Sequence, residues 1–364
     1  MVFYNLTMEL RYYIIRRFLI LIPTLFGLVL LTFILLRAIP TSDLIASFIS
    51  QKATAQERVI EKQQAIAYLG LNQPLPVQFL YYLNDIIHGN LGVMYTSFYT
   101  GPVMGGIERF LPYTLELSIA TVILSILIAI PLGTYIGARP NSPSDAIGRI
   151  FSLGVYAMPI FWLALLAQII FGKNIGIFGS YGFPISGEGY PTTTKVPWIV
   201  NNVSEPTHML FVDALLHGNL TIAYSAFIHL ILPVGVLTLS ILAGLLRFIR
   251  AGMVDTANQE FVKTARAKGV PEKLVLRRHV RKNALLPSVT VIGLLMAGLL
   301  GGVVVIEYVF QLRGMGRLTL ATITGLNIQF YGVAGTVLFF GIILMITNLI
   351  VDVVYAFLDP RIRY

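Results

Sequence analysis

Two segments of the chain place an acid and a histidine at a spacing that could hold a metal ion. Asp85-Ile-Ile-His-Gly-Asn-Leu91 and Asp213-Ala-Leu-Leu-His-Gly-Asn-Leu220 share the tail His-Gly-Asn-Leu, and the acid precedes the histidine by three or four residues. Residues at that spacing lie on one face of a helix, where a carboxylate and an imidazole could ligate a metal. The same pattern is typical of a short amphipathic helix that ends at a glycine, and we favour this second interpretation.

The other motifs that support chemistry are missing from the sequence. The chain has no cysteine, so it can form neither a disulfide nor a thiolate metal site. It contains no G-x-x-x-x-G-K-[S/T] phosphate loop, no H-E-x-x-H zinc motif and no G-x-S-x-G nucleophile. We therefore expect this chain to be no enzyme, to hold no metal or cofactor of its own, and to draw any energy of ATP hydrolysis from a partner.

Composition identifies an integral membrane protein. Of the 364 residues 56% are apolar and only 12% are charged, whereas about a quarter of residues are charged in soluble domains. Because about 20 apolar residues span a bilayer as a helix, we predict an all-α fold with about six transmembrane helices. The predicted spans are Phe18–Leu36, Leu117–Ala138, Ile150–Gly172, Thr221–Leu246, Asn283–Ile306 and Gly332–Val351.

The polar stretches between these spans suggest three domains. They are an N-terminal segment with the first span at 1–36, an external subdomain at 37–113, and a transmembrane domain at 114–364 that includes an external loop at 173–220. Within the subdomain we expect a helix over Thr54–Leu69 that Gly70 ends, and a second amphipathic segment at Val77–Ile87 after a proline turn.

A basic loop at 247–283 fixes the expected orientation. From Arg247 to Lys282 there are ten Lys/Arg against three acids, which the positive-inside rule places in the cytoplasm. Alternation from this loop puts both termini in the cytoplasm of a multi-pass protein of the cell membrane. The net charge of +9 then reflects topology and contact with membrane lipid, and nucleic acid is not needed as a partner.

The same loop has the pattern of a helical docking element. Val254, Ala257, Phe261 and Ala265 recur at helical spacing, so we expect one amphipathic helix over Asp255–Lys268. Gly269 is expected to end that helix, and Pro271 to stand at the first position of the next. Such a bent pair could insert into a groove of another protein; a basic helix that only touches anionic lipid is the alternative.

The residues of this loop resemble a known family. Glu260-Phe-Val-Lys-Thr-Ala-Arg-Ala-Lys-Gly269 is similar to the EAA-type loop of permeases in binding-protein-dependent ABC importers, in the oligopeptide, dipeptide and nickel branch, although Lys263 replaces the acid of the broader pattern. Similar segments run along nearly the whole chain. They include Gly70-Leu-Asn-Gln-Pro-Leu-Pro-Val-Gln78, Gly89-Asn-Leu-Gly92, Leu111-Pro-Tyr-Thr-Leu-Glu-Leu117, Met158-Pro-Ile-Phe-Trp162, Gly301-Gly-Val-Val-Val-Ile-Glu307 and Leu358-Asp-Pro-Arg-Ile-Arg363.

The resemblance implies a type I importer permease that works by alternating access. Its expected partners are a second homologous permease, two ABC ATPase subunits that bind ATP and Mg, and an extracellular substrate-binding protein. It favours di- or oligopeptides as substrate, with oligosaccharides as an alternative and a secondary transporter as a less favoured one. The implied ATPase-docking residues are Glu260, Phe261, Thr264, Ala265, Arg266, Ala267 and Gly269.

Two further sets of residues are candidate sites. Small residues at four-residue steps in the fifth span suggest close helix packing, and Gly298, Gly301, Gly302 and Glu307 are our candidates for the translocation path and its outer gate. Asn202 and Asn219 begin N-x-[S/T] sequons on the predicted outer side and are candidate glycosylation sites. His229 is the one ionisable residue inside a predicted span, where we expect a hydrogen-bonding rather than a proton-carrying role.

Overall fold

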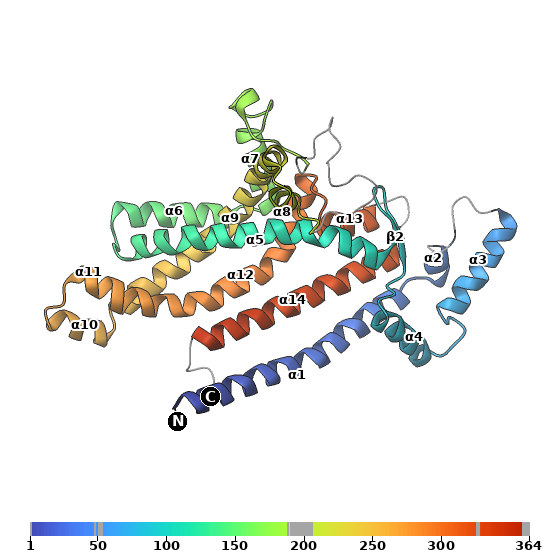
Figure 1. Ribbon diagram of the computed structural model, residues 1–364, viewed down its shortest axis with the longest axis horizontal. Helices are drawn as coiled ribbons and strands as arrows, with labels where there is room; N and C mark the ends of the chain where they lie inside the picture. Colours follow the sequence, from blue (N-terminus) through green and yellow to red (C-terminus); the bar gives the residue numbers. More distant parts are fainter. Residues whose placement is uncertain are drawn as a thin grey trace. The chain divides into compact units, whose positions relative to one another are not determined.

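A computed structural model describes residues 2–46, 49, 54–187, 189, 207–324 and 328–358 (Figure 1). Helices dominate this part of the chain, and the one sheet in it is a two-stranded hairpin. Two compact units make up the chain. The first comprises Met1–Ile14, Tyr113–Arg313 and Ile346–Tyr364, and the second comprises Ile15–Pro112 and Gly314–Met345.

The first unit is built around the long helix α9. This helix packs against α6, α7, α8 and α12. The unit also holds the part of α5 that starts at Tyr113 and the end of α14. The elements are α5 (Val103–Gly137), α6 (Pro143–Ala157), α7 (Ile160–Phe171), the 3₁₀-helix Gly179–Tyr181, α8 (Leu210–Leu216), α9 (Leu220–Ala257), α10 (Glu260–Ala267), α11 (Glu272–Leu274), the π-helix Val275–Val280 and α12 (Arg281–Val309).

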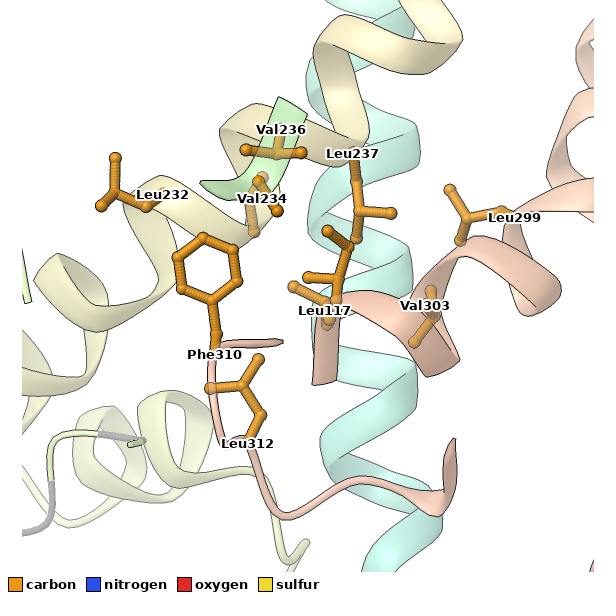
Figure 2. Packing of buried hydrophobic residues seen from close by; sticks show 11 residues of the cluster. Leu117, Leu232, Val234, Val236, Leu237, Leu299, Val303, Phe310 and Leu312 are labelled. Carbon is orange, nitrogen blue, oxygen red and sulfur yellow. The ribbon is translucent and has the colours of Figure 1, made fainter. Parts of the chain in front are cut away.

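Apolar side chains from three of these helices form a core. Leu117 of α5, Leu237 of α9 and Val303 of α12 converge, with Phe310 just beyond the end of α12 (Figure 2). All four are at most 1% exposed, so their contacts are made within the chain and not with lipid. This core fixes the positions of the helices that carry the candidate sites.

Glycines let α5 approach α9 closely. A Cβ atom on Gly133 would lie 2.8 Å from Cγ2 of Ile249, and one on Gly137 would lie 2.6 Å from Cβ of Met253. The numbering rises together along both helices, so the two run in the same direction where they touch. Absence of a side chain at these two positions is what permits the contact.

The predicted third span is broken. The uncharged window Ile150–Gly172 divides into α6 and α7, which meet at an angle of 108°. Met158 has an extended backbone (φ −84°, ψ 129°), as expected for a residue that precedes a proline, and Pro159 is the cap of α7. A composition window does not register this break, so the segment predicted as one spanning helix is two helices.

The second unit holds most of the segment between the first two predicted spans. Its elements are the main part of α1 (Val2–Arg37), α2 (Thr41–Ala46), α3 (Ala55–Tyr68), α4 (Leu75–Ile87), β1 (Val93–Tyr95), β2 (Thr100–Pro102), α13 (Met315–Thr324) and the first half of α14 (Phe330–Leu358). The strands pair antiparallel with Met94 opposite Gly101. Met94, Ile107 and Leu318 form a small core here.

The helices expected in this segment are confirmed. Thr54 and Glu57 form a reciprocal capping box at the start of α3. Gly70 follows α3 with φ +60°, where a side chain would meet the ring of Tyr81 at 2.9 Å. The second helix, α4, begins two residues before the predicted Val77 and ends at Ile87 as expected.

The all-α membrane fold is confirmed. Within the described residues four helices are long and apolar enough to cross a membrane, and the bent pair of α6 and α7 could be a fifth. The four cover the predicted first, second, fourth and last spans. The fifth predicted span, Asn283–Ile306, lies within the 29 residues of α12. The four membrane-crossing segments are Ile14–Arg37, Val103–Gly137, Leu220–Ala257 and Phe330–Val353.

Candidate docking site for a partner protein

The predicted docking helix is two helices. Helix α9 does not end with the membrane span but continues to Ala257, and α10 starts at Glu260. At the break, the side-chain amide of Asn258 donates a hydrogen bond to the carbonyl of Val254 over 3.1 Å. Asparagine competes for backbone groups in this way and favours a helix end. The expected continuous helix over Asp255–Lys268 is therefore wrong, although its residues are helical on both sides of the break.

One face of α10 packs into the unit. Val262 is fully buried and Ala265 is 7% exposed, and both belong to a core that includes Ile249 and Met253 of α9. Val275 and Val280 of the π-helix complete this core on the other side. Ala265, a predicted docking residue, thus contacts the chain itself.

The face of α10 next to this buried one is open. We call Phe261, Thr264, Ala267 and Lys268 the docking face, because all four side chains are exposed and three of them recur at positions i, i+3 and i+7. Phe261, the one aromatic residue of α10, is 45% exposed. Gly269 follows with φ +75°, as predicted, and nothing lies within 4 Å of where its side chain would be. Pro271 is the cap of α11, one position before the expected one.

Arg266 holds the ends of three helices together. Its Nε and Nη2 donate to the two carboxylate oxygens of Glu272 over 3.1 and 2.8 Å, and its Nη1 donates to the carbonyl of Ala257 over 3.1 Å. The hydrogen bond from Arg266 lowers the pKa of Glu272 below its usual value. Arg266, predicted to dock a partner, therefore also fixes α10 to α9 and α11. On the solvent side Lys263 pairs with Glu260 at 2.8 Å.

The π-helix is a feature that the sequence did not reveal. Val275 and Val280 are five residues apart and both fully buried. In an α-helix that spacing would turn their side chains about 140° apart, whereas the wider π-turn stacks them on one side. The chain adopts this geometry where it passes from α11 into α12, and both valines stay in the core beneath α10.

A buried ion pair behind the docking loop was also missed. The Nη2 of Arg250 in α9 donates to Asp145 Oδ2 over 2.9 Å, its Nε donates to Oδ1, and Asp145 is fully buried at the start of α6. The backbone amide of Asn141 donates to the same carboxylate over 3.0 Å. The sequence contained one signal for this pair: Asp145 is the lone acid between Arg139 and Arg149.

The candidate gate residues fall into two groups. Gly298 and Gly301 are exposed, and a Cβ on either would meet nothing within 4 Å. We call these two glycines and Tyr308, which is 52% exposed, the open face of α12. Gly302 instead faces the chain, with its Cβ position 3.1 Å from Ile160 of α7. Glu307 is also inside, 1% exposed, and accepts a hydrogen bond from the hydroxyl of Thr114 over 2.6 Å.

The remaining candidates have local roles. The rings of His88 and His217 hydrogen-bond through Nδ1 to backbone carbonyls four residues earlier, beside glycines with φ of +74° and +66° that end their helices. No group of three or more potential metal ligands occurs in the described part of the chain. Likewise His229 bonds the carbonyl of Ser225. Asn219 caps α9 by accepting from the amide of Ile222 over 3.1 Å, and Asn202 lies outside the described residues.

Comparison with known proteins identifies the family. The family described as "Binding-protein-dependent transport system inner membrane component" matches residues 129–364, and its N-terminal counterpart matches residues 10–118. The chain belongs to this family of inner-membrane transport components. It is thus a multi-pass permease, in agreement with the resemblance found in the sequence and with the apolar helices of the fold.

Relatives match over almost the full chain. The oligopeptide transport system permease protein AppB of Bacillus subtilis is 32% identical over 352 residues, which cover 97% of this chain and 99% of the relative. The probable D,D-dipeptide transport system permease protein DdpB of Escherichia coli is 35% identical and covers 92% of this chain and 93% of its own length. The dipeptide permease DppB of Alkalihalophilus pseudofirmus is 32% identical, with 97% and 99% covered.

Proposed function

We propose that this permease imports di- and oligopeptides as the transmembrane subunit of an ATP-driven ABC importer. The peptide substrate is supported by the names of the relatives, which are oligopeptide and dipeptide permeases along nearly their entire length. Oligosaccharide import, the alternative considered from the sequence, is not favoured by these relatives. Catalysis of ATP hydrolysis belongs to partner subunits, which bind ATP and Mg, and this chain carries the transport path.

The docking face of α10 is the observation that carries this proposal. It presents an exposed phenylalanine on a short helix whose other side is anchored in the core of the unit. An apolar side chain on a rigid, water-exposed helix fits a cleft of another protein, because its burial there removes apolar area from water at little cost in ordering. We assign the occupant of that cleft as one ABC ATPase per permease, with Glu260, Thr264, Ala267 and Gly269 lining the rim around Phe261.

A second homologous permease would lie against the open face of α12. Gly298 and Gly301 leave room there for the backbone of another helix, and small residues on a membrane helix permit such close approach. The transport path would form between the two permeases, with the docking faces and both termini in the cytoplasm and a substrate-binding protein outside. Closure of the two ATPases on ATP would then move α10 and, through Arg266, the end of α9.

Co-purification tests the proposal. A tagged chain extracted from its native membrane in mild detergent should bring with it a second permease, ABC ATPases and a binding protein, and the complex should hydrolyse ATP faster when peptide-loaded binding protein is added. Phe261→Asp should abolish co-purification of the ATPases and should lower the rate of peptide uptake at least tenfold. Phe261→Leu, which keeps the side chain apolar, is the matched control and should retain both.

The outcome that contradicts the proposal is equally clear. A chain that elutes alone, with uptake unchanged by Phe261→Asp and independent of ATP, would show that α10 docks no ATPase and would return a secondary transporter to consideration. Retention of the complex with a binding protein that selects oligosaccharides would contradict the substrate alone.

A further inference from the structure

In the described part of the chain, five cationic side chains that follow α10 and continue into the first turn of α12 have no ion-pair partner. We call Lys273, Arg277, Arg278, Arg281 and Lys282 the basic cluster. All five are exposed. The π-helix turns Val275 and Val280 inward and leaves the charged residues on the outside. Across the described residues no carboxylate lies within ion-pair distance of these five, and no aromatic ring stacks on them.

Several other cations of the same unit are engaged within the chain. Arg250 pairs with the buried Asp145, Lys263 with Glu260, and Arg266 with Glu272. Two more stack on aromatic rings: Arg139 on Tyr135, with 4.0 Å from its guanidinium carbon to the ring centre, and Arg247 on Tyr156, with 4.7 Å. Lys268 also makes no such contact, and it belongs to the docking face. The docking face therefore carries one such cation, whereas the basic cluster carries five.

The place of the basic cluster indicates what neutralises it. Lys282 is followed directly by Asn283 and by an uncharged stretch that extends to Ile306, and both lie in the single helix α12. A cation at the end of an apolar membrane helix lies at the level of the lipid headgroups, and its long stem can extend along the acyl boundary. Four to eight Lys/Arg immediately beside a membrane helix form the pattern that attracts anionic lipid.

We propose that the basic cluster binds the phosphate groups of anionic phospholipids at the cytoplasmic end of α12. Lipid phosphates would supply the negative charge that the described part of the chain does not, and would hold the π-helix and the core beneath α10 against the membrane surface. Anionic lipid would in this way support the helix that presents Phe261. The cytoplasmic assignment rests on the proposed orientation of the permease, whereas the preference for anionic headgroups does not.

Native mass spectrometry of the purified full-length chain tests this proposal. The chain is equilibrated in mild detergent with equal amounts of phosphatidylglycerol and phosphatidylcholine, and the ratio of the two lipids retained is measured. Replacement of all five residues (K273Q, R277Q, R278Q, R281Q and K282Q) should lower the retained ratio at least fivefold, since each cation near a membrane surface contributes up to about fivefold. Raising the salt to 1 M should lower the wild-type ratio in the same direction.

Two controls separate charge from other effects. The charge-conserving variant K273R, R277K, R278K, R281K and K282R should keep the wild-type ratio within about twofold, because the attraction depends on charge. The variant K263Q removes a cation of α10 that lies outside the docking face, and it should also leave the ratio unchanged. If the variant with all five substitutions does not elute as folded protein, single substitutions such as R277Q replace it. Each single substitution is expected to lower the ratio by a smaller amount.

Several results would overturn the proposal. They are an unchanged ratio in the neutralised variants, or an equal loss in the charge-conserving one. If the neutralised variant keeps its lipids but no longer co-purifies with ATPases, the basic cluster belongs to the protein partner. Because the lipid measurement uses this chain alone, its failure leaves the transport function untouched, and failure of the co-purification leaves the lipid site untouched.

Discussion

The docking face of α10 and the open face of α12 are two surfaces of one unit that the described chain leaves uncovered, and they differ in character. The first is a charged helix with one exposed aromatic ring, whereas the second is an apolar helix with two glycines and a tyrosine. A protein partner in water gains from covering an apolar ring, but lipid removes that gain inside a membrane, where close contact requires small residues instead. An uncovered surface therefore indicates a partner by different residue types in the two solvents: an exposed apolar ring in water, and small residues in lipid.

In both helices the uncovered face lies directly beside a face that holds the unit together. On α10, Ala265 is buried next to the exposed Phe261, and on α12, Gly302 contacts Ile160 next to the open Gly301. Neighbouring residues on one helix thus contribute either to folding of the unit or to contact with a partner. Substitutions at the two neighbouring positions can separate these contributions.

The largest effect is expected at Ala265. Ala265→Asp would place an unpaired carboxylate in the core beneath α10, which we expect to cost at least about 4 kcal/mol and to reduce the yield of folded protein severely. Phe261→Asp, on the neighbouring exposed face, should leave folding unchanged. Thermal unfolding of both variants, followed by size-exclusion chromatography in detergent, measures the difference, and equal unfolding temperatures would show that the two faces are not distinct.

The buried pair Asp145–Arg250 should come next. Asp145→Asn leaves Arg250 without its partner and is expected to destabilise the first unit by about 3 kcal/mol, because breaking one side of a buried pair leaves an uncompensated charge. Arg149→Gln is the matched control. Arg149 is half exposed and lies 3.7 Å from the same carboxylate, so its loss should cost under about 1 kcal/mol. Similar losses of thermal stability in the two variants would show that the Asp145–Arg250 pair does not stabilise the unit more than the exposed contact of Arg149 does.

The glycines of α12 should show a smaller but sharper contrast. Gly302→Leu would force a side chain against Ile160, at an expected cost of about 1–3 kcal/mol. Gly301→Leu should leave the stability of the isolated chain unchanged while it weakens co-purification of the second permease and peptide uptake. If Gly301→Leu has no effect on assembly, the open face of α12 faces lipid and not a partner.

The smallest effect concerns pH. The pKa of Glu272 is lowered by Arg266, so the pair contributes stability above the usual pKa of a glutamate and loses it as pH falls through the lowered value. Both side chains are about half exposed, and solvent screening limits the effect to under about 0.5 kcal/mol. The rate of amide hydrogen exchange in α10, divided by the intrinsic rate, should therefore rise slightly as pH falls toward 4. Arg266→Gln should remove this pH dependence.

The fold was predictable where composition or caps decide it. Apolar windows located four membrane-crossing helices, and the helix expected over Thr54–Leu69 with its end at Gly70 agrees with α3. The breaks were not predictable from periodicity. Val254, Ala257, Phe261 and Ala265 keep helical spacing across the turn at Asn258, and the five-residue step from Val275 to Val280 fits no regular α-helix.

The candidate site was predictable as a segment but not as a surface. Resemblance indicated residues 260–269, yet burial separates Ala265 from Phe261, and the contacts of Arg266 with Glu272 and Ala257 depend on how three helices meet. Tertiary packing decides which side of a short helix remains free, and spacing alone does not report it.

Site-specific cross-linking on the two faces of α10 tests the central claim most directly. The chain contains no cysteine, so a single cysteine at a chosen position is the only site in this chain that a thiol-reactive photo-cross-linker can label. In membranes that contain the whole transport system, probes at Phe261, Thr264 and Lys268 should cross-link to an ABC ATPase, and probes at Val262 and Ala265 should give only cross-links within the chain. Cross-links to the ATPase from the buried positions, or to lipid alone from the exposed ones, would contradict the account.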